Sequence, residues 1–198
     1  MPSFDTVHQF EEKISNYFGS PYAVSVDSCT HGIELCLRYD KVCKTACPNH
    51  TYLSVPMTLK KLGIDWTFVN TKWLSYYYLS NTRIIDAAVL WKKNSYIPGT
   101  LMCLSFQFRK HLSIGRAGMI LTDTYDTYSD LKRMSYDGRN NSIPWAEQNI
   151  TQMGYHYYMT PESAEYGIQK FEEVKDLPAK LWSYKDYPDL SSLTVFNK

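Results

Sequence analysis

The stretch that decides the fold is Ser105-Phe-Gln-Phe-Arg-Lys110-His-Leu-Ser-Ile-Gly115-Arg-Ala-Gly118. It follows an apolar run at 101–106 and precedes another at 119–122, so we predict two buried strands joined by a glycine-containing turn. Lys110 lies in that turn, where loss of hydration favours a neutral amine. A neutral lysine amine is what Schiff-base formation with an aldehyde requires. Lys110 is therefore the first candidate for catalysis, although a lysine so placed can also extend its amine into solvent.

Predicted strands alternate with predicted helices along most of the chain. Apolar spacing, caps and glycine stops indicate helices at 5–18, 28–37, 51–62, 124–134 and 161–174. Short apolar runs indicate further strands at 22–26, 44–47, 66–70 and 83–87. This alternation predicts an α/β fold whose mostly parallel sheet is covered by helices on both faces. Ligands of such sheets gather at the carboxyl ends of the strands, here 27–30, 48–52, 86–88 and 105–110.

Composition limits the classes of partner and compartment. The 198 residues carry a net charge of +1, which gives no reason to expect nucleic acid or a membrane surface as a partner. The five cysteines form no CxxC pair, so we expect reduced thiols in a cytoplasmic protein and no metal site. The length predicts one domain over residues 1–176, followed by an extension over 177–198 that could embrace a partner. The aromatic clusters at 73–78 and 155–158 are predicted to lie in an interface.

Short motifs follow the predicted strand ends in a fixed order. They are Ser28-Cys-Thr30, Pro48-Asn-His-Thr-Tyr52, Asp86-Ala-Ala88, Ser105 with Lys110, and Gly154-Tyr-His-Tyr-Tyr-Met159. The order resembles that of the DegT/StrS sugar aminotransferases, fold-type-I pyridoxal phosphate (PLP) enzymes that carry SGTxAL, PxxT-aromatic, EDAAQ, SFxxxKxxxxGEGG and GxNYRM. The resemblance covers residues 7–171. It implies the PLP-binding large domain of that fold, shortened and lacking most of the C-terminal small domain.

The resemblance implies a catalytic role for Lys110 and Asp86. Lys110 would form the Schiff base with PLP and move the substrate proton. Asp86 would pair with the pyridinium nitrogen and keep it protonated. The backbone N–H groups of Cys29 and Thr30, at a helix N-terminus, would bind the cofactor phosphate. The structural alternative is that the carboxylate and the residues before the helix are only caps.

Further cofactor contacts are implied by the same resemblance. Ser105 would add a hydroxyl to the phosphate, Tyr52 would stack on the pyridine ring, and Ala88 would lie beside the cofactor. His156 stands where the family has an asparagine that reaches the neighbouring subunit's phosphate. The resemblance therefore implies a homodimer whose active sites are shared between chains. Arg116 replaces a family glutamate, a departure that bears on the substrate.

The expected activity is transfer of an amino group from a glutamate-like amino acid to a carbonyl acceptor. A keto-sugar nucleotide is the acceptor that the resemblance implies. Two alternatives stay open. The same Schiff base supports decarboxylation of an amino acid, for which Arg109, Arg116 or Arg139 would bind a carboxylate. A degenerate fold that binds a ligand without turnover is the other.

Overall fold

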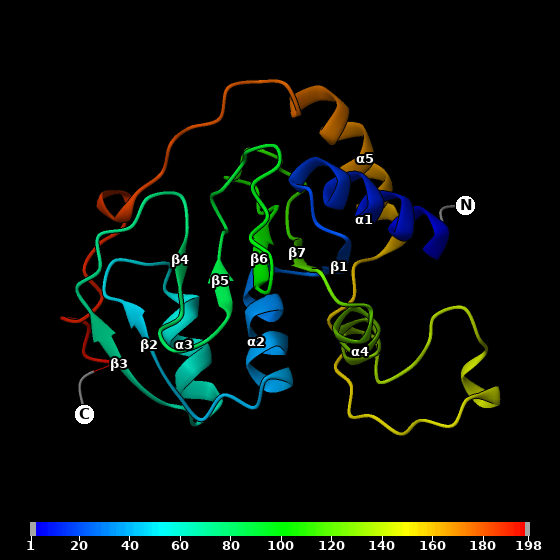
Figure 1. Cartoon of the computed structure of the whole chain (residues 1–198), viewed down its shortest axis with the longest axis horizontal. Coiled ribbons are helices and arrows are strands. Elements are labelled where there is room, and N and C mark those ends of the chain that lie inside the picture. Colours follow the sequence, from blue (N-terminus) through cyan, green and yellow to red (C-terminus); the bar gives the residue numbers. More distant parts are fainter. Residues whose placement is uncertain (1–2, 197–198) are drawn as a thin grey trace.

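The computed structural model describes residues 3–196, and Figure 1 shows how its elements are arranged. The helices are α1 (Phe4–Phe18), α2 (Cys29–Tyr39), α3 (Ser54–Lys61), α4 (Tyr125–Ser135), α5 (Pro161–Val174) and the short 3-10 helices η1 (Trp145–Glu147) and η2 (Tyr184–Asp186). The strands are β1 (Tyr22–Val26), β2 (Lys44–Pro48), β3 (Asp65–Val69), β4 (Tyr77–Tyr78), β5 (Ile84–Asp86), β6 (Leu101–Ser105) and β7 (Gly118–Thr122). Every predicted helix and strand is present, and β4, η1 and η2 are additional.

The strands form a five-stranded sheet in the order β1-β7-β6-β5-β4 and a separate two-stranded sheet, β2-β3. In the larger sheet only β5 and β6 pair in parallel, whereas β7 is antiparallel to both neighbours and β4 is antiparallel to β5. The prediction of a mostly parallel sheet is therefore wrong in this detail, and the sheet is mixed. The β2-β3 pair is parallel, as predicted for strands separated by a helix.

Direct connections explain two of the three antiparallel pairs described above, β4–β5 and β6–β7. Residues 106–117 join β6 to β7, and residues 79–83 join β4 to β5. Parallel neighbours need a crossover of a dozen or more residues, usually containing a helix, whereas a hairpin joins antiparallel neighbours directly. The Lys110 turn is thus the loop of a hairpin between two central strands.

Helices cover both faces of the larger sheet, as predicted. Successive residues of β6 enter different cores, because side chains alternate along a strand: Leu101 and Cys103 pack with α2, α3 and α4, and Met102 and Leu104 pack with α1 and α5. Figure 1 shows α1 and α5 side by side. The Phe10 ring of α1 packs directly on Gly167 of α5. A Cβ added to Gly167 would lie only 2.8 Å from that ring.

The C-terminal segment, residues 177–196, turns back over its own chain. Figure 1 shows it running from α5 past β4 to β3. Ser75 N–H donates to Trp182 O (2.8 Å), and Leu190 N–H donates to Asn49 O (2.9 Å). The Phe196 ring packs edge-on against Trp66. The predicted extension 177–198 is thus an intramolecular strap over the part described here, and residues 197–198 lie outside the described residues.

Two further observations concern the whole of residues 3–196. None of the helices in this range has the length and apolarity needed to cross a membrane. Trp73 and Tyr77, predicted to lie in an interface, are instead buried in the chain's own core at 7% and 6% exposure. The interface prediction is wrong for these two residues, because the strap and α3 cover them from the same chain.

Candidate active site

The predicted motifs converge at the carboxyl ends of β5 and β6. Asp86 ends β5, Ser105 ends β6, and the N-terminus of α2 lies beside them. A cavity of about 180 Å³ lies at this point. Its lining includes every predicted site residue except His156: Cys29, Thr30, Tyr52, Asp86, Ala88, Ser105 and Lys110. The sequence motifs therefore form one site in space.

Asp86 is a buried carboxylate with a partner on each oxygen. Tyr77 Oη donates to Oδ2 (2.7 Å), and Ala88 N–H donates to Oδ1 (2.9 Å). Burial raises the pKa of Asp86, while the Tyr77 hydroxyl, the Ala88 N–H and the charge of Lys110 oppose the rise. Burial also raises the pKa of Tyr77 well above its ordinary value, so its hydroxyl stays a donor. Each carboxylate oxygen keeps a second lone pair for a further donor in the cavity.

Lys110 lies in the β6–β7 hairpin loop, half-buried. Its backbone N–H donates to Gln107 O (2.8 Å), which fixes the turn. Burial lowers the pKa of Lys110, and the negative charge of Asp86 opposes that change. A lowered pKa increases the fraction of neutral amine, as the sequence predicts, and a neutral amine is a nucleophile toward carbonyl carbon.

The wall opposite the lysine is the first turn of α2. Ser28 caps the helix by accepting a hydrogen bond from His31 N–H (3.2 Å), so the N–H groups of Cys29 and Thr30 are at the helix end that favours anions. Gly118, the last glycine of the quoted stretch, lies directly against this turn. A Cβ on Gly118 would be 2.4 Å from the Cys29 nitrogen, so only glycine fits there.

Arg116, the departure from the family glutamate, forms an ion pair at the cavity mouth. Its guanidinium donates to Asp27 Oδ2 (2.9 Å), and Asp27 Oδ1 lies 2.6 Å from His31 Nδ1. The His31 ring stacks on Tyr157 at 3.7 Å between centroids. The last motif of the chain thus packs on the first.

His156 does not line the cavity. Its ring is in the segment after α4, 70% exposed, and Nδ1 lies 3.1 Å from Asp137 Oδ2. This exposed position leaves the predicted contact with a partner subunit's phosphate as a prediction.

Sequence comparison now identifies the family, because the sequence pattern of the DegT/DnrJ/EryC1/StrS aminotransferase family matches residues 2–90 and 93–181. The chain belongs to this family. No curated protein matches this member in sequence. The family and the fold-type-I large domain predicted from the motifs are therefore confirmed.

Solved structures resemble this family member in fold at low sequence identity. AtS13 from Actinomadura melliaura is 18% identical, with a TM-score of 0.77 over 88% of this chain and 61% of that one. The sugar aminotransferase CalS13 from Micromonospora echinospora is 13% identical, with a TM-score of 0.72 over 87% and 61%. Spr1654 from Streptococcus pneumoniae in its PLP form is 15% identical, with a TM-score of 0.73 over 88% and 60%. The chain thus spans about three fifths of the length of the structures it matches.

The cavity residues fit pyridoxal phosphate, the predicted cofactor. A lysine whose pKa is lowered by burial, a buried carboxylate with free lone pairs and a helix N-terminus line one cavity, and these match the aldehyde, the pyridinium N–H and the phosphate of PLP. The exposed Tyr52 ring, 53% accessible, borders the same cavity and offers a face for stacking.

Tyr77 and Thr51 belong to the site but are not among the residues that the sequence motifs predict for it. The Thr51 hydroxyl pairs with Tyr77 Oη, which in turn donates to Asp86, so the carboxylate is tied to the residue just before Tyr52. The available signal was the dense run of aromatic residues at 73–78, which was assigned to an interface. An aromatic residue with a buried polar tip needs a hydrogen-bond partner, and Asp86 is the nearest predicted acid in the sequence.

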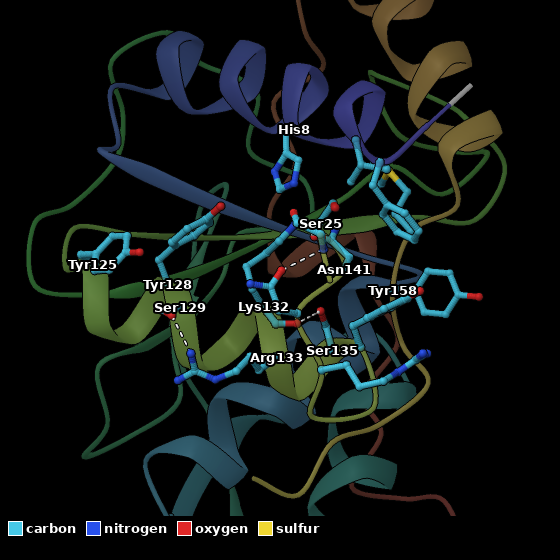
Figure 2. A pocket seen from close by; sticks show the side chains of 17 residues that line it. His8, Ser25, Tyr125, Tyr128, Ser129, Lys132, Arg133, Ser135, Asn141 and Tyr158 are labelled. Atoms are coloured by element: carbon cyan, nitrogen blue, oxygen red, sulfur yellow. Dashed lines mark hydrogen bonds between the residues drawn. The ribbon is translucent and has the colours of Figure 1, made fainter. Parts of the chain in front are cut away.

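A second cavity, of about 190 Å³, lies between α1 and α4, and Arg139 is the one predicted candidate among the residues that line it. Figure 2 shows His8 of α1 and Lys132 of α4 pointing into it. Lys132 Nζ lies 2.7 Å from Oε1 of the buried Glu11. Burial raises the pKa of Glu11, but the charge of Lys132 and hydrogen bonds from His8, Lys132 and Ser25 lower it to about 2 overall. This cavity is therefore built around an internal ion pair.

Proposed function

We propose that the chain is a PLP-dependent aminotransferase large domain that moves an amino group from a glutamate-like donor to a carbonyl acceptor. The observation that supports this most is that Lys110 and Asp86 line the same cavity as the N-terminus of α2. When bound, PLP supplies an electron sink for the α-carbon of an amino acid. The free cysteines suit a cytoplasmic location.

Each residue has a distinct task in this proposal. Lys110 is the residue that would hold the cofactor aldehyde, and its Nζ would take and return the substrate proton. Asp86, held by Tyr77 Oη and the Ala88 N–H, would be the carboxylate that keeps the cofactor's ring nitrogen protonated. Cys29 and Thr30 N–H groups and the Ser105 hydroxyl bind the phosphate, and Tyr52 covers one face of the ring.

The acceptor and the oligomer complete the proposal. CalS13, similar in fold, is a sugar aminotransferase, and a keto-sugar nucleotide is the acceptor we propose here. We also propose that two copies pair, with His156 of each donating to the phosphate in the other's cavity. Mixing Lys110→Ala with His156→Ala protein would restore activity in hybrids if sites are shared, and lack of recovery would contradict sharing.

The test of the activity is the absorption spectrum of the purified chain with PLP, before and after glutamate. We expect a band from the covalent lysine–cofactor link that glutamate removes, with release of 2-oxoglutarate. Borohydride reduction followed by peptide mapping should place the cofactor on Lys110. Lys110→Ala should lose the band, and Lys93→Ala, an exposed lysine outside the cavity, should keep it.

Other outcomes would redirect the assignment. Carbon dioxide release without 2-oxoglutarate would mean decarboxylation. A band that never forms would mean that the fold is retained without the chemistry. Attachment of the reduced cofactor to another lysine would refute the role of Lys110. Asp86→Ala should keep the band but slow turnover severely, because the ring nitrogen loses the group that keeps it protonated.

A further inference from the structure

A third cavity, of about 200 Å³, borders the cofactor cavity. The two share Ala88, Ser105 and Lys110. The rest of its lining comes from the segment after β5, the Lys110 loop and the C-terminal strap: Val89, Leu90, Trp91, Arg109, His111, Leu112, Lys180 and Trp182. Lys110 thus lies between the cavity that fits the cofactor and this third cavity, which we call the chamber beside Lys110.

The chamber beside Lys110 is lined by several hydrogen-bond donors and by no acidic residue. Its charged residues are Arg109, Lys110 and Lys180, all cationic. Trp91 Nε1 is a buried donor without a hydrogen-bond partner among the described residues.

The positions of these donors are fixed by neighbouring groups. His111 Nε2 donates to Val174 O (2.9 Å), and the His111 ring packs on Trp91 at 5.2 Å between centroids. On the strap side, Lys180 Nζ lies 3.6 Å from the centroid of the Trp182 ring and 2.8 Å from Asp186 Oδ1. The Trp182 ring in turn lies 5.9 Å from Lys110 Nζ. The strap therefore forms one wall of the chamber beside the reactive lysine.

The cavity of Figure 2 provides the contrast. There each cation has a carboxylate of its own: Lys132 pairs with Glu11, and Arg133 with Asp130. Around the chamber beside Lys110, Arg109 forms no ion pair among residues 3–196. Arg109 is exposed, so its guanidinium fork is free to bind a planar oxyanion with two N–H groups.

We infer that this chamber binds an oxyanion group of the substrate, with the exposed Arg109 as its specificity-determining donor and the Trp91 ring in its wall. The inference rests on the proposed function, because a substrate reacting at Lys110 would extend its unreactive end into the chamber. The oxyanion is the distal carboxylate of a dicarboxylic amino acid or the phosphate of a carbonyl acceptor. Both present acceptor oxygens of the same geometry to a guanidinium.

The experiment is NMR of the five tryptophan indole N–H signals of the full chain. Glutarate, an unreactive dicarboxylate, is titrated against its neutral analogue glutaramide, and inorganic phosphate is titrated separately. We expect the Trp91 signal, assigned with Trp91→Phe, to move on adding glutarate and to stay in place with glutaramide. If glutarate binds more tightly than phosphate, the amino acid that donates the amino group supplies the oxyanion. If phosphate binds more tightly, the carbonyl acceptor supplies it.

Variants separate the chamber from general charge effects. Arg109→Gln should weaken glutarate binding about tenfold or more, as expected for loss of a charge-assisted pair. Lys93→Gln removes an equal charge near Trp91 but outside the chamber, and should leave binding unchanged. Unshifted distant indole signals report that each variant is folded.

Each remaining outcome decides between the two proposals. Equal shifts with glutarate and glutaramide, or no effect of Arg109→Gln, would overturn the oxyanion chamber. If PLP gives its lysine-linked band but Trp91 never moves, the chamber alone fails. If Trp91 moves and no band forms with PLP, the proposed function fails and oxyanion binding stands.

Discussion

Tyr77→Phe tests whether a hydrogen bond from within the chain helps to keep Asp86 ionised. The Tyr77 hydroxyl donates to Asp86 Oδ2 over 2.7 Å, and both residues are buried, so water cannot replace the lost donor. A hydrogen bond to a charged group contributes about 1.5–3 kcal/mol, and one between neutral groups about 0.5–1.5 kcal/mol. We expect Tyr77→Phe to lower the free energy of unfolding by about 2 kcal/mol at pH 7 and by about 1 kcal/mol where Asp86 is protonated.

The direction of the pH dependence follows from burial. Because the pKa of Asp86 is raised in the folded chain, stability from its protonated form is complete below the unfolded pKa of about 3.9 and is lost as pH rises through the folded pKa. Removing the Tyr77 hydroxyl raises the pKa of Asp86 in the folded chain further. The stability that is lost as pH rises is then larger in the variant than in wild type. The difference in the free energy of unfolding between wild type and variant should therefore narrow as pH falls from 7 toward the unfolded pKa of about 3.9.

The assay is urea unfolding followed by tryptophan fluorescence at each pH. Tyr78→Phe is the matched control, because Tyr78 is the neighbouring residue of β4 and is 43% exposed. Thr51→Val removes the other partner of the Tyr77 hydroxyl without touching the carboxylate, so its effect should not depend on pH. Equal losses in Tyr77→Phe and Tyr78→Phe, or a Tyr77→Phe loss independent of pH, would refute the reasoning.

Two more substitutions test other parts of the structure by urea unfolding. Lys132→Met removes the lysine partner of the buried Glu11 carboxylate, leaving it only the contacts with His8 and Ser25, and should cost about 3–5 kcal/mol at pH 7, a loss that shrinks as pH falls from 4.5 toward about 2. Lys13→Met, which removes an exposed pair, should cost at most about 1 kcal/mol, and similar costs for both would contradict the buried-pair argument. Gly118→Ala should cost about 1–3 kcal/mol and weaken PLP binding, because its Cβ meets the first turn of α2. Gly115→Ala is the control, because its Cβ meets nothing within 4 Å, and it should leave PLP binding intact despite its φ of +91°. Unchanged PLP binding in Gly118→Ala would contradict a role for the contact between Gly118 and the first turn of α2.

Local signals account for what the sequence could predict. Helix α5 begins at Pro161 after the Thr160 cap, as predicted, because a cap and a proline at the first position act on their own residues. The cofactor cavity was predictable because its residues follow strand ends, and strand ends on one edge meet. Strand direction was not, since an apolar run such as Met119–Thr122 has the same pattern in either direction.

Long-range packing accounts for the rest. The two-residue strand β4 is too short to show a period, so the one signal for the Tyr77–Asp86 pair was the need of a buried hydroxyl for a partner. The Arg116–Asp27 pair joins residues far apart in the sequence. The chamber beside Lys110 depends on a strap whose sequence has no regular pattern, so Trp182 carried no signal of its position.

The hairpin that carries Lys110 also bears on the order in which the site forms. Strands β6 and β7 are joined by residues 106–117, so their pairing closes only a short loop, whereas residues 27–117 separate β1 from β7. Loop closure over a short separation is fast, and contacts distant in sequence form slowly. During refolding from urea, the β6–β7 hairpin that carries Lys110 should therefore form early, and the first turn of α2 should reach its place beside it late. Capture of PLP would then follow the slowest kinetic phase, and a cofactor added during refolding would report when α2 docks.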